Sequence, residues 1–261
     1  MPFNNAIMFA GIPIYQLTDS GGDGVYNVEN EVFSKFGVNT VGGSLVLLTI
    51  TGDRKAVHIA GLAIDATGLD SDAKLIITLS TIDINARGGD GGDGGESFWV
   101  FEGETNEWFG TSFAGEDGES GGNAISLGCK TTIKGTGTIR SGKGGGGGGG
   151  SYDNSSSTPF QGGSGGGGGA PFGDKGLLGI GNQSDGNDGT DATETSKGVG
   201  GAAVNNGGAG GNGGENGTAA QAGSNATSNG GSAGGDGDTV VKNGFTLTKL
   251  GSVTYEGNEG V

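Results

Sequence analysis

Apolar and polar side chains alternate most regularly in the first third of the chain. Apolar residues recur at every second position in residues 44–50, 55–59, 74–79 and 81–85, and Gly and Asp stand between these segments. A period of two predicts half-buried β-strands bounded by turns. Residues 28–36 are expected to form one short helix. The first 85 residues therefore predict a small β domain with a modest apolar core.

Glycine replaces this alternation after residue 86. Of the 66 glycines, 10 lie in residues 1–85 and 56 lie in residues 86–261. Between the glycine clusters lie two strand-like segments, 123–141 and 238–261. A strand pair followed by glycines occurs at 76–89 and again at 131–144, which indicates a stacked architecture. The glycine clusters occupy residues 88–95, 114–122, 142–150, 162–169, 173–181, 198–201, 207–214 and 230–237.

The composition excludes several classes of protein. Hydrophobic residues other than glycine make up 31% of the chain, against the usual 45–50% or so with glycine counted, which leaves too few apolar side chains for an ordinary helical or α/β enzyme core. The 4 prolines show no triplet period, so collagen is excluded. No apolar run is long enough to cross a membrane, and the N-terminus lacks the basic segment of a standard signal peptide. A net charge of −16 argues against nucleic-acid binding, because phosphate backbones repel an acidic chain.

Glycine runs can themselves form a core. A left-handed extended helix has three residues per turn and a rise of about 3.1 Å, and all of its N–H and C=O groups point outward. Without Cβ atoms, such helices can approach closely and hydrogen-bond on every side. The predicted fold is thus mainly β with a packed bundle of polyglycine-II helices. Its parts are an N-terminal β attachment domain, 1–87; a polyglycine-helix sandwich with variable loops, 88–238; and C-terminal strands, 239–261, that close on the attachment side.

The chain order predicts where the loops gather. If successive glycine helices run antiparallel, their connections alternate between two ends. One end then receives 96–113, 151–161, 182–197 and about 215–229, which are long and diverse in composition. The other end receives 123–141, a tight link at Pro171 and Phe172, a short link at 204–206, and the C-terminal strands. This partition predicts a rigid stalk with one decorated tip, and loops on a rigid scaffold commonly carry recognition.

The order of these segments resembles the tip adhesins of T-even-type bacteriophage long tail fibres. The resemblance covers roughly residues 86–240, and its most specific stretch is a five-glycine run that closes on Ala-Pro-Phe-Gly at 165–173. It implies a non-enzymatic virion protein at the distal, extracellular end of a tail fibre. It also implies that variable loops bind a bacterial surface receptor, commonly an outer-membrane porin. The matching segments are 86–92, 118–123, 131–139, 144–150 and 165–173.

The first 85 residues lack the usual N-terminal pattern of that family. The partner on the phage is therefore either a trimeric tail-fibre shaft protein or a tail hub. The apolar start, residues 6–15, either inserts into this partner or completes the local sheet, and no membrane insertion is expected. The residues expected to serve attachment are Phe3, Ile7, Met8, Phe9 and Ile12.

Receptor binding is expected at three polar loops, 151–161, 182–197 and 215–229. Their mixture of aromatic, hydroxyl, amide and acidic side chains suits a binding loop, and the partner would be an outer-membrane protein or a surface polysaccharide. The expected receptor-binding residues are Tyr152, Asp153, Asn154, Ser156, Thr158, Phe160, Gln161, Gln183, Asp185, Asn187, Asp188, Thr193, Asn216, Gln221, Asn225 and Thr227.

An aromatic segment holds both tryptophans of the chain. It is either an exposed receptor anchor or a small core that caps the glycine helices. The second interpretation is favoured, since a large exposed aromatic patch would invite aggregation. This tip aromatic cluster comprises Phe98, Trp99, Phe101, Trp108, Phe109 and Phe113.

Little in the sequence indicates catalysis or a cofactor. Cys129 lies in a strand-like stretch and is expected to be a packed small residue, and with His58 it cannot build a zinc site. Residues 88–93 and 185–191 resemble parts of calcium-binding loops, but the second lacks the glutamate at its twelfth position. No enzyme activity, metal or other cofactor is therefore expected.

Two other classes remain open from the sequence. One is a structural tail or virion component whose polar loops are buried against other virion proteins. The other is a secreted glycine-rich calcium-binding module or polysaccharide enzyme, whose folding would depend on metal.

Overall fold

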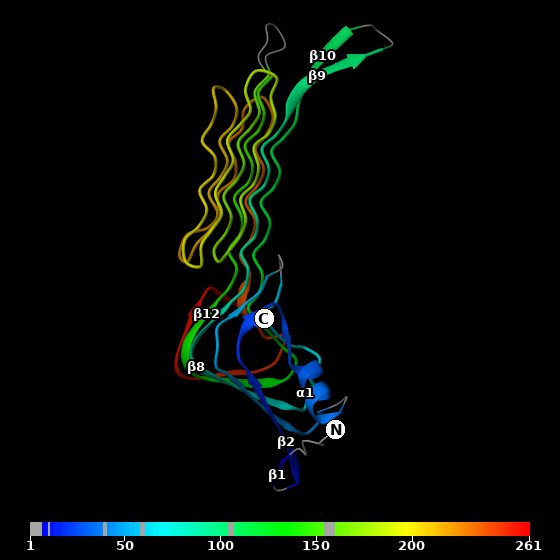
Figure 1. Ribbon diagram of the computed structural model, residues 1–261, viewed down its shortest axis with the longest axis vertical. Helices are drawn as coiled ribbons and strands as arrows, with labels where there is room; N and C mark the ends of the chain where they lie inside the picture. The colour runs from blue at the N-terminus through cyan, green and yellow to red at the C-terminus, as the bar shows by residue number, and fades with distance from the viewer. Residues whose placement is uncertain (1–6, 10, 39–40, 58–60, 104–106, 154–159) are drawn as a thin grey trace. The chain divides into compact units, whose positions relative to one another are not determined.

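The chain folds into two compact units. The computed structural model describes residues 7–9, 11–38, 41–57, 61–103, 107–153 and 160–261, with the backbone alone at 7–9, 101–102 and 107–109. Unit 1 comprises Met1–Ala86, Asn123–Ser141 and Asp238–Val261, and unit 2 comprises Arg87–Gly122 and Gly142–Gly237 (Figure 1). The chain thus enters unit 2 twice. The sequence-based boundaries differ, because they counted 123–141 within the glycine-rich domain.

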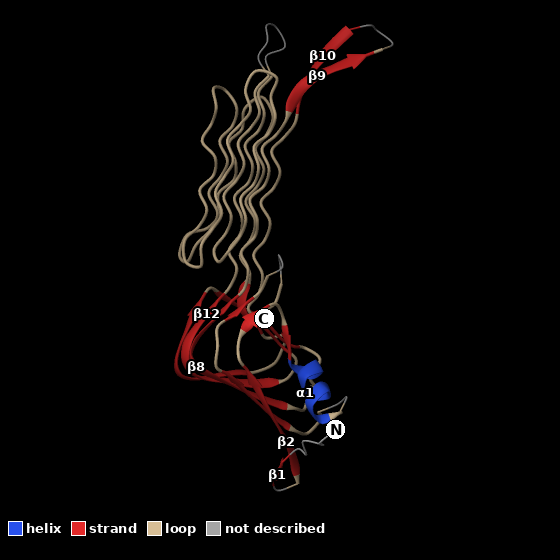
Figure 2. Ribbon diagram, in the orientation of Figure 1, coloured by secondary structure: helices blue, strands red, loops and turns tan. Residues whose placement is uncertain are grey.

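Unit 1 is built from two sheets whose strands are mostly parallel (Figure 2). In the larger sheet the order is β1-β2-β5-β8-β12-β14, with β3 and β6 beside the second half of β8. In the smaller sheet the order is β15-β13-β11-β7-β4. The strands of the larger sheet are β1 (Ile7–Phe9), β2 (Ile12–Asp19), β3 (Gly22–Asp23), β5 (Leu45–Ile50), β6 (Arg54–Lys55), β8 (Lys74–Asn85), β12 (Lys130–Arg140) and β14 (Leu247–Glu256). Those of the smaller sheet are β4 (Tyr26–Asn27), β7 (Ile64–Ala66), β11 (Ile125–Leu127), β13 (Asp238–Val241) and β15 (Asn258–Gly260).

The two sheet orders describe a coil. Strands β2, β5, β8, β12 and β14 follow one another across the larger sheet, and β4, β7, β11, β13 and β15 follow in the same order across the smaller one. Each turn of the chain therefore stacks on the previous turn in register, as in solenoid architectures. The repeated strand pattern in the sequence predicted stacking, and the structure shows it. The parallel pairing itself was not expected.

Alternate residues of these strands fill the core of unit 1. Leu17, Leu48, Ile77 and Ile133 are partners on successive strands, and all four are buried. The predicted strand 44–50 corresponds to β5. The two strands predicted at 74–79 and 81–85 form one continuous strand, β8, so the division between them is wrong, and β6 is shorter than the prediction for 55–59. The remainder of that prediction, with His58, lies outside the described residues.

The predicted helix is present as α1 (Val28–Phe36). Its N-cap is Asn27, whose side-chain oxygen accepts the backbone N–H of Asn30 at 2.9 Å, and its C-cap is Gly37 in the left-handed conformation. Both caps satisfy backbone groups that a helix end leaves unpaired. The helix buries Val28 and Val32 against the coil.

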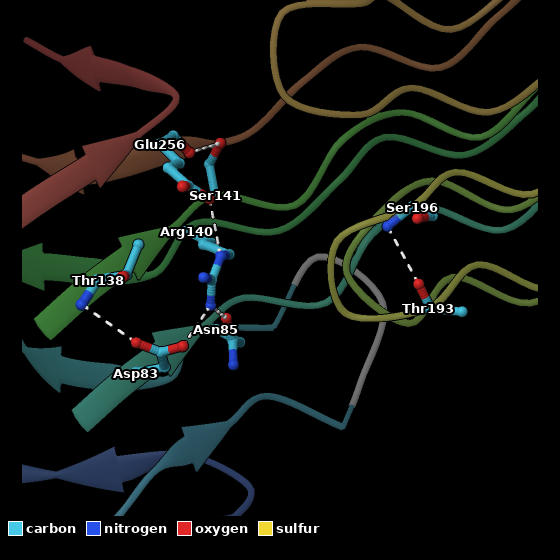
Figure 3. Close-up of polar contacts among 8 residues, drawn as sticks. All are labelled: Asp83, Asn85, Thr138, Arg140, Ser141, Thr193, Ser196 and Glu256. Atoms are coloured by element: carbon cyan, nitrogen blue, oxygen red, sulfur yellow. Dashed lines mark hydrogen bonds and ion pairs between the residues drawn. The ribbon is translucent and has the colours of Figure 1, made fainter.

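One arginine joins three stacked strands of unit 1. The guanidinium of Arg140 on β12 donates to Asp83 on β8 and to Glu256 on β14, each at 2.7 Å, and to Asn85 at 3.1 Å (Figure 3). Burial acts to raise the pKa of Asp83, but the hydrogen bond and charge of Arg140 outweigh burial and lower it. These two ion pairs therefore hold strands β8, β12 and β14 in register.

Unit 2 consists largely of extended runs that lie side by side (Figure 1). Apart from the hairpin formed by β9 (Ser97–Glu102) and β10 (Glu107–Ser112), its described residues form neither helices nor strands beyond isolated bridges (Figure 2). We number the runs along the chain: run 1 is 87–96, run 2 is 113–122, run 3 is 142–151, run 4 is 161–170, run 5 is 173–181, run 6 is 185–192, run 7 is 197–203, run 8 is 207–214, run 9 is 219–225 and run 10 is 229–237.

Backbone hydrogen bonds join these runs at every third residue. Between runs 1 and 3, for example, the N–H groups of Gly89, Gly92 and Gly95 donate to the carbonyls of Lys143, Gly146 and Gly149 at 2.8–2.9 Å. The same period of three links each run to its other neighbours. A run with three residues per turn can thus bond in several directions at once.

The glycine content of each run follows the number of its neighbours. Runs 3 and 4 are surrounded: run 3 bonds to runs 1, 2, 4, 8, 9 and 10, and run 4 to runs 1, 3, 5, 6, 7 and 8. All their residues are buried, and both contain consecutive glycines, 144–150 and 165–169. Runs 1 and 8 each bond to both surrounded runs, 3 and 4, and to two peripheral runs. They carry Gly at two of every three positions. Runs 2 and 5 need Gly only at every third position.

Candidate functional site

The connections between runs lie at two ends of unit 2. At one end the chain passes between the units, after residues 86, 122, 141 and 237; we call it the crossover end. The other, the hairpin end, holds the β9–β10 hairpin, the segment that follows run 3, and turns at 181–184, 204–207 and 225–228. The predicted binding residues within the described part divide between these two ends and the runs that join them.

Cross-turn hydrogen bonds hold the hairpin end together. The side-chain oxygen of Gln161 accepts the backbone N–H of Asn206 at 2.6 Å, and the side-chain amide of Asn205 donates to the hydroxyl of Ser184 at 3.2 Å. The hydroxyl of Thr227 accepts the N–H of Asp153 at 3.1 Å. These contacts join segments that are far apart in the sequence into one surface.

Aromatic side chains pack under this surface. Trp99 of β9 meets Phe160 edge to face with ring centroids 4.7 Å apart, and Phe98 stacks on Phe113 at 5.5 Å. Gly110 of β10 lies where a side chain would overlap the ring of Phe160. Trp99 therefore belongs to a small core, while Phe98 and Phe113 remain more than one-third exposed. Side chains of Phe101, Trp108 and Phe109 are outside the described part.

Some predicted receptor-binding residues do reach the hairpin end. Tyr152, Asp153, Gln183, Asn225 and Thr227 lie there, half-buried or exposed. Asn154, Ser156 and Thr158 are outside the described residues. Phe160 and Gln161 also lie at this end, but their exposed fractions are 1% and 3%. In this structure both side chains lie beneath the surface, so their expected direct contact with a receptor stays a prediction that their burial does not support.

Other predicted binding residues lie elsewhere. Thr193 belongs to a turn at the crossover end, where its hydroxyl accepts the N–H of Ser196 at 3.0 Å (Figure 3). Asn216 lies in a second turn at that end, bounded by the mutual backbone bonds of Glu215 and Thr218. Residues 182–197 and 215–229 are thus not single tip loops. Each contains a whole run, because Gly at every third position is sufficient for a run at the periphery.

Four predicted residues therefore lie along runs. The side-chain amide of Asn187 donates to the carbonyl of Ala202 at 3.0 Å, and the side-chain oxygen of Gln221 accepts from Asn212 at 2.9 Å. Asp185, at the start of run 6, accepts the N–H of Gly181 at 3.1 Å, and Asp188 accepts that of Leu178 at 3.0 Å. These side chains stabilise neighbouring runs.

One turn of the hairpin end was placed at the wrong end from the sequence. The short link 204–206 is predicted at the end opposite the tip, whereas in the structure Asn205 contacts Ser184 and Asn206 contacts Gln161 at the hairpin end. Asn205 has a positive φ of 51°, a conformation that Asn tolerates better than most residues. The Asn-Asn-Gly sequence at 205–207 predicts a turn. The end of unit 2 at which it lies depends on the number of preceding runs, and run 6 is not evident from the sequence.

Several aspartates of unit 2 act as caps for backbone N–H groups of neighbouring runs. Asp90 and Asp93 of run 1 accept the N–H groups of Asp174 and Leu177, each at 2.7 Å. Asp188 additionally pairs with Lys175, and the hydrogen bonds from Lys175 and from Leu178 lower the pKa of Asp188. The carboxylates at 185–191, which resembled a calcium loop, are used in this way. Within the described residues, no group of three or more His, Cys, Asp and Glu side chains is placed to hold a metal.

Two further expectations can be placed. Cys129 is fully buried in the core of unit 1, as predicted for a packed small residue, and burial raises its pKa. Ile12 is about half exposed, and β1 pairs with the start of β2, which agrees with a local sheet as the role of the apolar start. Phe3 is outside the described residues. In the described part, no helix has the length and apolar character needed to cross a bilayer.

A glycine-rich scaffold that gathers turns and a hairpin at one end is an arrangement typical of proteins that bind through loops on a rigid support. Residues 14–260 match the family described as phage tail fibre adhesin Gp38, and the chain belongs to this family. It is therefore a phage tail fibre adhesin and not an enzyme.

A solved structure supports the fold. The chain is similar to a chain in the crystal structure of the gp37-gp38 adhesin tip complex of the long tail fibre of bacteriophage S16, with a TM-score of 0.51 and 21% identity over 94% of this chain and 82% of that one. A comparison with curated proteins gave no match.

Proposed function

We propose that this adhesin sits at the tip of a long tail fibre and binds a bacterial surface receptor through the hairpin end of unit 2. The receptor is an outer-membrane protein such as a porin. The observation that carries this proposal is the convergence of several described segments at one end, namely residues 97–103, 107–112, 152–153, 160–161, 181–184, 204–207 and 225–228. Their exposed side chains are mostly amides and hydroxyls, which suit adaptable hydrogen bonding on a rigid support.

The rigidity of that support follows from the packing of its runs, which are packed polyglycine-II helices. Hydrogen bonds at every third residue, made in several directions, are the bonding that this helix allows and that an α-helix or a β-strand does not. Each glycine of runs 3 and 4 faces other backbone, so the core of unit 2 is backbone. Loop exchange at the hairpin end therefore leaves the core unchanged.

Unit 1 attaches the adhesin to the phage. The S16 structure is a complex with gp37, and by analogy the partner of this chain is a trimeric shaft protein. Its contact surface includes the apolar start, with Phe3, Ile7, Met8, Phe9 and Ile12, and the exposed side chain of Ile12 supports this role. If Ile12→Asp left co-purification with the shaft protein intact, this surface would be excluded.

Exchange of exposed side chains at the hairpin end tests receptor binding. The triple variant Asn182→Ala, Gln183→Ala, Asn205→Gly removes three exposed side chains and keeps a residue that accepts the positive φ at 205. We expect its binding to susceptible cells to fall at least tenfold, because contacts at the centre of an interface commonly contribute several kcal/mol together.

A matched variant at the other end serves as the control. Thr195→Ala with Asn216→Ala also removes exposed polar side chains, but from the crossover end. Its binding should equal that of the unmodified chain. If this control lost binding while the hairpin-end variant kept it, the receptor would bind at the crossover end, and our proposal would be contradicted.

A further inference from the structure

A groove lies along the side of unit 2, next to the hairpin end. Its volume is about 600 Å³. The floor is formed by the last residues of run 1, 93–96, and the walls by Phe113–Glu116 of run 2 and by Leu177–Ile180 of run 5. Runs 2 and 5 both hydrogen-bond to run 1, so the three form a continuous face. The floor contains two glycines, which leaves room between the side chains of the walls.

The walls of this groove present apolar side chains to solvent. Leu177 is 53% exposed, Ile180 is 59% exposed and Phe113 is 46% exposed. The backbone core of unit 2 does not require Leu177 or Ile180, and Phe113 packs only on Phe98 among the aromatic contacts of the described residues. Outward positions of the other peripheral runs carry mostly Ser, Thr, Asn, Asp and Ala. An apolar cluster at this one place therefore indicates a contact surface.

The carboxylates around the groove fall into two groups. Those of Asp93 and Asp188 accept backbone N–H groups of run 5, and Asp188 also pairs with Lys175. Glu96 and Glu116 are exposed, and among the described residues neither carboxylate has a hydrogen-bond or ion-pair partner. The groove thus offers two available negative charges beside aliphatic and aromatic side chains.

We infer that this groove is a second contact site, for an extended protein segment with an arginine next to an aliphatic residue. Charge complementarity selects this occupant. A guanidinium can bind a carboxylate with two hydrogen bonds and also stack on an aromatic ring such as that of Phe113. The aliphatic neighbour would cover Leu177 and Ile180. The inference rests on the proposed function, since it assigns the groove to a loop of the same surface receptor.

Binding of a defined peptide to the full purified chain tests the inference. The probe is the fluorescent peptide acetyl-Gly-Leu-Arg-Leu-Arg-Gly-amide, with the same peptide carrying Gln for Arg as a comparison. We expect saturable binding of the Arg peptide. Glu96→Gln with Glu116→Gln should weaken it at least tenfold. The matched control Glu119→Gln, an exposed glutamate of run 2 that does not line the groove, should leave it unchanged.

The outcomes separate this inference from the proposed function. Equal binding of the Arg and Gln peptides would contradict the inferred contact site. So would a loss of peptide binding in the Glu119→Gln control as large as that in the Glu96→Gln, Glu116→Gln variant. So would binding of a cationic glucosamine tetramer that competes fully with the peptide and depends on the same glutamates, because the occupant would then be a glycan. Cell binding that depends on the hairpin end would stand in each of these cases. If the hairpin-end variant bound cells as well as the unmodified chain did, while peptide binding stayed intact, the proposed function would be contradicted and the groove would stand.

Discussion

At the scale of single residues, the spacing of glycine in unit 2 reports where other backbone approaches. A Cβ at Gly234 in run 10 would overlap the carbonyl of Glu119, whereas one at the next residue, Gly235, meets its nearest atom at 3.6 Å. Both glycines have an ordinary backbone conformation, since neither has a positive φ. The two positions thus differ in packing alone.

This pair gives a direct test of backbone packing. Gly234→Ala should lower the free energy of unfolding by about 2 kcal/mol or more, because the added methyl group forces two runs apart. Gly235→Ala should be neutral or stabilise by up to about 1 kcal/mol, because it reduces the freedom of the unfolded chain. Urea unfolding of both variants measures the difference, and equal stabilities would show that run 10 does not pack as described.

A buried ion pair in unit 1 gives a second test at this scale. The Arg54 guanidinium donates two hydrogen bonds of 2.6 Å to the carboxylate of Asp19, and both side chains are less than one-tenth exposed. Arg54→Met should cost about 3–5 kcal/mol, because it leaves a buried carboxylate without its counter-charge. The double variant Asp19→Asn with Arg54→Met should recover part of this loss in urea unfolding. No recovery would mean that packing of the arginine, and not charge, dominates.

At the scale of elements, the sequence predicted best where a pattern is local. The helix α1 was found at the predicted residues because Asn27 and Gly37 provide its caps. Strands β5 and β8 followed from alternation, since one side of each faces the core. In contrast, the parallel order of the strands depends on segments separated by whole insertions, which no local pattern records.

The runs of unit 2 show why the positions of the candidate binding residues could be predicted only in part. Consecutive glycines marked runs 3 and 4, which are buried on all sides. Run 6, 185–192, has Gly only at 186 and 189, and such sparse glycine predicts a loop. Without this run in the count, the predicted ends of Thr193, Asn216 and the turn at 204–207 are each reversed. Side chains such as Asp188, chosen for their polarity, proved to cap neighbouring backbone.

The acidic caps make the runs sensitive to pH. Hydrogen bonds from Lys175 lower the pKa of Asp188, and those from Lys197 lower the pKa of Glu215. A carboxyl with a lowered pKa in the folded state stabilises it above the usual pKa, and this contribution is lost as the pH falls through the folded value. The melting temperature should therefore be steady between about pH 6 and 8 and fall below about pH 4.

Removal of the titrating groups checks this assignment. In Asp188→Asn with Glu215→Gln, an oxygen remains to accept the backbone N–H, but no carboxyl is left to protonate. The decline of the melting temperature below about pH 4 should be shallower in this variant than in the unmodified chain. A decline of identical slope would assign the acid sensitivity to other carboxylates.

At the scale of the whole molecule, two insertions in a coil account for the chain order. Unit 2 is inserted after β8 and again after β12, and the coil of unit 1 resumes each time with the next strand in register. The ends of each insertion are hydrogen-bonded neighbours, Arg87 with Gly122 and Gly142 with Gly237. The coil can therefore be closed without either insertion, and unit 2 can vary without altering the strand pairing of unit 1.

Excision of both insertions tests whether unit 1 folds by itself. In the variant, residues 88–121 and 143–236 are each replaced by Asn-Gly, a sequence that favours a tight turn between adjacent strands. Because the core residues of unit 1 all come from outside unit 2, we expect β-type circular dichroism and one cooperative thermal transition. An unfolded product would show that unit 2 contributes to the stability of the coil. A folded product that still co-purifies with the shaft protein, but no longer binds cells, would assign attachment and recognition to separate units.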